Sequence, residues 1–358
     1  MVFEGLASLV IVCGALFGKN KAKNKKAYII IMCVAFSIIS GFRSYKVGTD
    51  TPGYAEAFLN APPLSFSSLV EIFSKREPFF YLLQALVREI TSEYWMFFLL
   101  TSTFFISVLG CFIYKYSKIP AISFLLFMSM GYFSFSMAGI RQTIAISFLI
   151  IALDKLINGK KIGSFINILI ATMFHIVSLI FVVIYFVKKT PLNIWYILLI
   201  GIISFLFSMY SDVVVETMVE IVWQGERNYG DTSGGVSTFV LLALITVATF
   251  VFYPNVFRSQ KALLLNCEVE KDIFFLKLLL VSIAFQVLAI FQANAFRLSM
   301  IFQLPLMALL PNVLNYQKGK SLFFANFVVV VALLIQLFVF TVGVADILPY
   351  TFFWQVTL

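Results

Sequence analysis

Charged residues are scarce in this sequence. Only 12% of its 358 residues are Asp, Glu, Lys or Arg, whereas about a quarter are charged in typical soluble domains. Hydrophobic residues make up 61%, and the mean hydropathy is +0.99. This composition excludes a water-soluble globular fold. The apolar runs are continuous rather than alternating, which favours membrane-spanning helices over the strands of a membrane barrel.

Residues that bind metals or form disulfides are also scarce. The only histidine is His175, and the four cysteines, Cys13, Cys33, Cys111 and Cys267, show no paired spacing. We therefore expect no metal site, no disulfide and no cofactor. The net charge of +9 does not indicate nucleic-acid binding, because the lysines lie in short loops between apolar runs, where the bias of inner loops toward positive charge explains them.

Lysine and arginine are distributed differently along the chain. Lysines gather in clusters between apolar runs, which indicates loops on the inner side of the membrane. The first cluster follows the first apolar run, so the N-terminus is predicted outside and the run is not a cleavable signal peptide. The clusters are Lys19–Lys26, Lys115–Lys118, Lys155–Lys161, Lys188–Lys189 and Lys318–Lys320.

These clusters predict an all-α, polytopic integral membrane protein in which residues 1–358 form a single transmembrane domain. We expect about 12 membrane-crossing helices, counted from the apolar runs and their flanking lysines. Residues 162–187 are the difficult stretch. A single span there would place Lys188 and Lys189 outside, so we favour a short helical hairpin with His175 near its outer turn; a re-entrant pair is the alternative.

Two longer polar segments are predicted on the outer side, at residues 43–93 and 211–236. Within the first, Glu77–Thr91 is amphipathic and has a proline where a first helical turn would begin. This pattern predicts an outer-face helix that lies in the membrane interface.

Three arginines stand singly where apolar runs meet the outer side: Arg43, Arg141 and Arg297. The planar guanidinium suits phosphate, and Arg141 begins a predicted helix whose free N–H groups also attract anions. As interfacial anchors these arginines would instead pair with carboxylates or lipid headgroups. Ionisable groups at membrane depth usually serve function, so we predict an outer site for an anion such as pyrophosphate.

Three further residues are candidates for acid–base chemistry: His175, Asp50 and Glu77. An imidazole titrates near neutral pH and could serve as a general base, although a lone histidine in an apolar run often only bonds a neighbouring carbonyl. Asp50 lies in a turn-like run and Glu77 directly precedes Pro78, so each could instead cap a turn or helix. The tyrosines of the outer segments are individually interpreted as interfacial belt residues.

The order of these motifs resembles that of EpsG-like membrane proteins, part of the broader Wzy-type polysaccharide polymerases that build O-antigen, capsule or exopolysaccharide. The resemblance extends from about Gly41 to Trp354. The matching runs are GFRSYKVGTDTPGYAEAF, EPFFYLLQALV, GIRQTIAISFLIIAL, ATMFHIVSLIF, FRLSMIFQLP and a tail with LPY and Trp354.

The resemblance implies a glycosyltransferase of the bacterial inner (plasma) membrane whose active site faces the periplasm or exterior. Such an enzyme transfers a growing glycan from undecaprenyl pyrophosphate to the non-reducing end of a lipid-linked repeat unit, without a metal. Its partners would be the lipid-linked donor and acceptor and the bilayer, with a chain-length regulator and a flippase as candidate further partners.

The family's motifs can be carried over residue by residue. Its arginines match Arg43, Arg141 and Arg297, which the resemblance assigns to the pyrophosphate. Its Gly-Thr-Asp, Glu-Pro and Phe-His motifs match Asp50, Glu77 and His175, which are then the candidate catalytic residues.

Two other functions fit parts of this pattern. A transporter or flippase of lipid-linked oligosaccharide would also bind pyrophosphate, but the sequence lacks two matching halves with interrupted helices. A membrane acyltransferase could also use His175, but we find no polar inner residues to receive an acyl donor.

Overall fold

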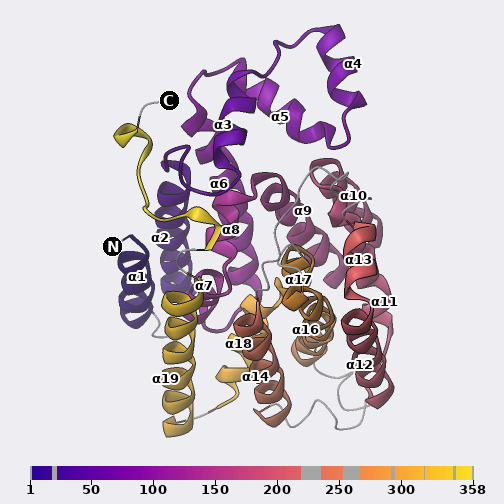
Figure 1. Ribbon diagram of the computed structural model, residues 1–358. Coiled ribbons are helices and arrows are strands. Elements are labelled where there is room, and N and C mark those ends of the chain that lie inside the picture. The colour runs from indigo at the N-terminus through magenta and orange to yellow at the C-terminus, as the bar shows by residue number, and fades with distance from the viewer. Residues whose placement is uncertain are drawn as a thin grey trace. The chain divides into compact units, whose positions relative to one another are not determined.

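The computed structural model is built from helices (Figure 1). Within the residues it describes there is no β-strand, and only an isolated bridge joins Arg43 to Phe352. The prediction of an all-α fold is therefore confirmed. The described residues are 2–17, 22–218, 235–252, 267–291, 295–317, 319–341 and 344–356.

The chain divides into two compact units. The first comprises Met1–Tyr116, Pro120–Leu179 and Ala332–Leu358, and the second comprises Ser117–Ile119 and Ile180–Val331. The helices that lie within the first unit are α1 (Val2–Phe17), α2 (Ala22–Gly41), α3 (Thr51–Leu59), α4 (Phe66–Ser74), α5 (Pro78–Arg88), α6 (Tyr94–Tyr116), α7 (Pro120–Ser129), α8 (Tyr132–Ala138), α9 (Ile140–Ile157) and α10 (Lys161–Phe174).

The helices of the second unit begin after a 3-10 segment at Ile176–Val183. The last of them, α19, runs into the C-terminal part of the first unit. They are α11 (Ile184–Lys189), α12 (Ile194–Met209), α13 (Ser211–Met218), α14 (Val236–Phe252), α16 (Cys267–Phe291), α17 (Phe296–Gln303), α18 (Leu306–Asn315) and α19 (Gly319–Ile335).

Four described helices are long and apolar enough to cross a membrane, and the count rises to six if two bent pairs are each one span. The pairs are α7 with α8, bent by 54°, and α17 with α18, bent by 49°. Four more apolar helices have 10–17 residues, so they are shorter than a typical span. The predicted count of about 12 crossings is not confirmed. The four long spans are Asn24–Gly41, Tyr94–Tyr116, Glu268–Phe291 and Gly319–Val339.

Lysines from two predicted inner clusters lie at one end of the helices of the first unit. Tyr116, at the end of α6, donates its hydroxyl to Asp154 Oδ1 near the end of α9 (2.8 Å), and Lys115 forms an ion pair with the same carboxylate. Lys25, in the first turns of α2, stands 5.4 Å from the ring centre of Tyr114. The end of α2 and the starts of α6 and α9 therefore lie toward the opposite, predicted outer end.

The helix is interrupted at His175, within the stretch 162–187. Helix α10 packs against α9 and ends at Phe174, and His175 is extended, with φ −157° and ψ 115°. A 3-10 segment and α11 follow. The side of the membrane on which Lys188 lies stays a prediction.

The segment 43–93, for which outer-face amphipathic helices are predicted, contains three short helices. Helices α3, α4 and α5 are grouped together in Figure 1, and α5 packs against α3, α4 and α10. Packing against protein covers Phe80, Ala85 and Val87 of the helix predicted to lie in the interface. In the segment 211–236, α13 and the first residue of α14 are described, and residues 219–234 lie outside the described residues.

We expect Lys189→Cys to resist an impermeant thiol reagent added outside intact cells, because the hairpin places Lys189 on the inner side. Lys189 is exposed, so burial alone would not block labelling. The native cysteines would be replaced first, and Lys46→Cys, exposed in the predicted outer segment, is the matched control. Ready labelling of Lys189→Cys from outside would contradict the hairpin.

We also expect Gly41→Ala to destabilise the protein. A Cβ atom at Gly41 would lie 2.7 Å from the Cα atom of Leu99, which is backbone and cannot rotate away. Overpacking of this kind costs about 1–3 kcal/mol, which thermal unfolding in detergent would detect. Gly53→Ala is the control, because a Cβ there meets no described atom within 4 Å. Equal melting temperatures for the two variants would contradict close packing at Gly41.

Candidate functional site

A buried carboxylate, that of Glu77, lies between α4 and α5. Glu77 is the residue before the first turn of α5, and Pro78 follows it. Proline is favoured at this position because its ring fixes a helical φ and its missing N–H would have no intrahelical partner. The side chain of Glu77 is only 9% exposed. A carboxylate this buried needs charged or hydrogen-bonding partners to stay ionised.

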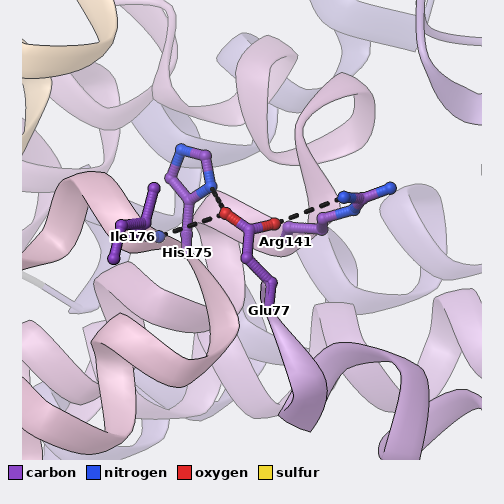
Figure 2. Close-up of polar contacts among 4 residues, drawn as sticks. All are labelled: Glu77, Arg141, His175 and Ile176. Atoms are coloured by element: carbon purple, nitrogen blue, oxygen red, sulfur yellow. Dashed lines mark hydrogen bonds and ion pairs between the residues drawn. The ribbon is translucent and has the colours of Figure 1, made fainter. Parts of the chain in front are cut away.

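Three donors supply those partners. Figure 2 shows the carboxylate of Glu77 between the imidazole of His175 and the guanidinium of Arg141. Oε1 pairs with Nδ1 of His175 (2.8 Å) and accepts the backbone N–H of Ile176 (3.1 Å). Oε2 accepts from Nη1 of Arg141 (3.2 Å). Segments far apart in the sequence are thus joined at one carboxylate.

These partners decide the charge of Glu77. Burial by itself would raise the pKa of the carboxyl group. This effect of burial is outweighed by the hydrogen bond and charge of His175, by the N–H of Ile176 and by the charge of Arg141. Together they lower the pKa of Glu77 to about 2. Glu77 is therefore ionised at neutral pH.

His175 reaches Glu77 because α10 ends one residue before it. The N–H of His175 still bonds the carbonyl of Ala171 (2.8 Å), while its own carbonyl accepts from Ser178 (3.0 Å). Nε2 is buried and has no hydrogen-bond partner among the described residues. With Nδ1–H donated to Glu77, the neutral ring carries its lone pair on Nε2.

Arg141 is the second residue of α9 and lies among aromatic rings. Its guanidinium carbon is 5.6 Å from the ring centre of Tyr54, 5.1 Å from that of Phe80 and 5.4 Å from that of Tyr81. The side chain is 33% exposed. Nη1 binds Glu77, so other N–H groups remain that could bind a second anion, and the faces of the nearby rings favour the positive charge of the guanidinium.

The aromatic surroundings of Arg141 are not predicted from the sequence. The sequence pattern predicts Tyr54 and Tyr81 as interfacial belt residues, but Tyr54 is buried and both rings lie against the guanidinium. One signal was present in the sequence. Tyr81 follows Glu77 by four residues at the start of a predicted helix, which places both on one face.

The structure brings together three of the six predicted site residues: Glu77, Arg141 and His175. Arg43 is fully buried, and it donates to the carbonyls of Ser40 and Met137. Asp50 is partly buried at the start of α3, where its backbone carbonyl accepts from the N–H of Tyr54 (3.2 Å).

The remaining candidate, Arg297, is the second residue of α17 and belongs to the second unit. Among the described residues, no group of three His, Cys, Asp or Glu side chains could hold a metal ion. The cluster itself combines a histidine that can accept a proton with an arginine that can bind an anion.

We expect Glu77→Gln to lower the free energy of unfolding at neutral pH. The pKa of Glu77 is lower in the folded chain, about 2, than the unfolded value of about 4.3. Its carboxylate therefore stabilises the fold above the unfolded pKa, and this contribution is lost as pH falls toward 2. By linkage the contribution is about 3 kcal/mol.

Unfolding of the purified protein in detergent, measured at pH 7, 5, 4 and 3, tests this expectation. The difference between wild type and Glu77→Gln should shrink only below about pH 4.5, near the unfolded pKa. The control is Glu71→Gln, because Glu71 is 65% exposed and forms its ion pair with Lys75, the residue that follows α4, rather than with the cluster. A difference that stays constant down to pH 3 would contradict the assignment.

The comparison with known proteins addresses the family. No curated protein and no solved structure matches the chain. The family model described as the EpsG family matches residues 26–352, and this range includes all the residues of the cluster. The match to this family supports a role in polysaccharide biosynthesis as a polymerase-type transferase. Because the match covers most of the sequence and agrees with the motif order found in it, the chain belongs to the EpsG family.

Proposed function

We propose that this protein is a polysaccharide polymerase that transfers a growing glycan from undecaprenyl pyrophosphate to the non-reducing end of a lipid-linked repeat unit. The observation that carries the proposal is the Glu77–His175–Arg141 cluster. Its partly exposed arginine can bind an anion, and its histidine has an unpaired ring nitrogen. Glycosyl transfer from a pyrophosphate donor needs both functions.

In the proposed reaction His175 is the general base. A hydroxyl of the acceptor sugar attacks the anomeric carbon of the donor glycan and passes its proton to Nε2. Glu77 holds the ring through Nδ1 and stabilises the imidazolium that forms. Because Nε2 is shielded from solvent, the binding of the acceptor must displace a neighbouring side chain.

Arg141 acts on the leaving group. As the bond from the anomeric carbon to the phosphate oxygen breaks, the electron pair stays on undecaprenyl pyrophosphate. Arg141 lies at the start of α9, where free N–H groups add positive potential. Its guanidinium can neutralise the developing charge without a metal ion.

Other parts of the proposal rest on the sequence pattern. Arg297 is proposed as a second cation for the pyrophosphate, and Asp50 as an alternative base. The site is proposed to face the exterior of the bacterial inner membrane, because the cluster lies at the end of the first unit opposite Lys115 and Lys25. A chain-length regulator and a flippase are candidate partners.

The alternative, transport of the lipid-linked oligosaccharide, has less support. Transport would explain an arginine that binds pyrophosphate. It gives no role to a histidine whose ring is oriented by a carboxylate and whose other nitrogen is unpaired.

We expect Arg141→Ala to abolish polymer formation by purified protein supplied with undecaprenyl-pyrophosphate-linked repeat units. Loss of one transition-state donor typically lowers kcat by about 100- to 1,000-fold. Arg141→Lys should also be poor, because a point charge cannot replace the planar fork. His175→Ala should lose about 100- to 10,000-fold as the base is removed. The glycan ladder on a gel measures all three variants.

Arg88→Ala is the matched control, because Arg88 lies in the last turn of α5, where it contacts the carbonyl of Leu59 rather than the cluster. It should retain the ladder. Normal chain lengths from Arg141→Ala would remove the basis for the proposal. If wild-type protein makes no ladder from verified substrate but carries the lipid-linked unit across proteoliposomes, transport replaces polymerisation.

A further inference from the structure

Arg43 is among the largest fully buried side chains of the protein, and it is charged. Its guanidinium carbon lies 4.4 Å from the ring centre of Phe98, and Nη2 donates to the carbonyl of Met137 (2.8 Å). Nη1 donates to the carbonyl of Ser40. Burial of a charge is costly unless the surroundings compensate it, so this position requires a physical reason.

The two acceptor carbonyls provide that reason. Ser40 lies in the last turn of α2, which ends at Gly41, and Met137 lies in the last turn of α8, which ends at Ala138. The last carbonyls of a helix have no intrahelical partner and carry the negative end of the helix dipole. One guanidinium therefore caps the C-terminal ends of two helices and ties them together.

The Gly-Thr-Asp-Thr run converges on the same end of α8. The hydroxyl of Thr51 donates to the carbonyl of Met137 (3.0 Å), which thus accepts from both Thr51 and Arg43. Gly48 has φ +106°, and a Cβ atom there would lie 3.2 Å from the oxygen of Met137. Glycine is needed at Gly48 both for this φ and for this close approach.

The C-terminal segment encloses Arg43 from the other side. The N–H of Ser44 donates to the carbonyl of Thr351, and the N–H of Phe353 donates to the carbonyl of Phe42 (both 2.9 Å). These bonds flank the bridge between Arg43 and Phe352. With two carbonyls as acceptors and no exposed surface, Arg43 does not present its guanidinium to a ligand.

Arg43 bonds the C-terminal end of α8, and Arg141 lies just beyond the corner at which the chain passes from α8 into α9. Helix α8 ends at Ala138, Gly139 follows, and Arg141 is the second residue of α9. We propose that Arg43 is a positioning residue, which fixes the corner between α8 and α9 and thereby the guanidinium of Arg141, and that it does not bind the pyrophosphate. This inference rests on the proposed function of Arg141.

The test is a double-mutant cycle on the binding of undecaprenyl pyrophosphate to the full-length protein in nanodiscs. Thr51→Val removes one of the two donors to Met137 with little change in volume, and Arg43→Gln removes the charge. If both residues act through Arg141, Thr51→Val should weaken binding about 2- to 10-fold, the value of one net hydrogen bond. In an Arg141→Ala background, neither substitution should weaken binding further.

Thr49→Val is the matched control, because Thr49 is exposed in the same run and should bind like wild type. An independent ligand role for Arg43 predicts the opposite pattern, in which Arg43→Gln weakens binding equally with and without Arg141 and Thr51→Val has no effect. That result would overturn the inference. Arg43→Gln leaves a buried polar side chain, so Thr51→Val decides the outcome if Arg43→Gln does not fold.

Hydrogen exchange separates this inference from the proposed function. The N–H of Thr143 bonds the carbonyl of Gly139 in the first turn of α9 (2.9 Å). We expect amides of residues 139–145 to exchange faster in Thr51→Val than in Thr49→Val, with no change in α5. If wild type does not bind undecaprenyl pyrophosphate, the proposed function fails. Unchanged exchange at residues 139–145 would overturn the positioning role itself.

Discussion

The ionised carboxylate of Glu77 sets the arrangement of the candidate site, because it is buried and must be surrounded by positive charge and N–H donors. Its partners come from the start of α9 and from the residues that follow α10. Each partner is held by a helix terminus, where the chain can change direction and place a polar group. If α10 continued as a helix past Phe174, the N–H of Ile176 would bond within the helix. Glu77 would then lose one of its donors. The break at His175 is therefore a requirement of the site.

The sequence predicted the features that depend on local signals. Apolar runs between lysine clusters gave the helices, and the contact of Tyr116 and Lys115 with Asp154 agrees with a shared inner end for α6 and α9. The number of spans was harder to predict, because composition shows neither where a helix ends nor where it bends: four apolar helices have only 10–17 residues, and two apolar stretches are bent pairs. The turn at Gly131, with φ +78°, separates α7 from α8 inside one apolar stretch. Hydropathy averages over such a turn and counts the stretch as a single straight helix.

The candidate site was predicted only in part, because local sequence signals do not show which distant residues meet. Glu77 before Pro78, His175 as the only histidine and Arg141 at a helix start are visible in the sequence, although their convergence on one carboxylate is not. The position of Arg43 depends on contacts that join distant segments, such as Ser44 with Thr351, 307 residues apart. From the sequence, Arg43 and Arg141 look equivalent, since each follows a glycine and an apolar residue. Burial distinguishes them: Arg43 is fully enclosed, whereas the side chain of Arg141 is 33% exposed.

In the proposed reaction, this difference in burial gives different roles to two arginines that have the same local sequence. A group that binds pyrophosphate must exchange partners during turnover, so its charge has to be accessible and only partly neutralised. Arg141 satisfies this condition, because Glu77 engages Nη1 and leaves other N–H groups for an anion. A residue that only positions another has the opposite requirement, because it must keep the same partners throughout turnover. Arg43 meets this requirement, since its guanidinium is buried and bonded to the ends of two helices. In the proposed reaction, pyrophosphate therefore meets the remaining N–H groups of Arg141 in a position that is already set, without a rearrangement of the helix that carries them.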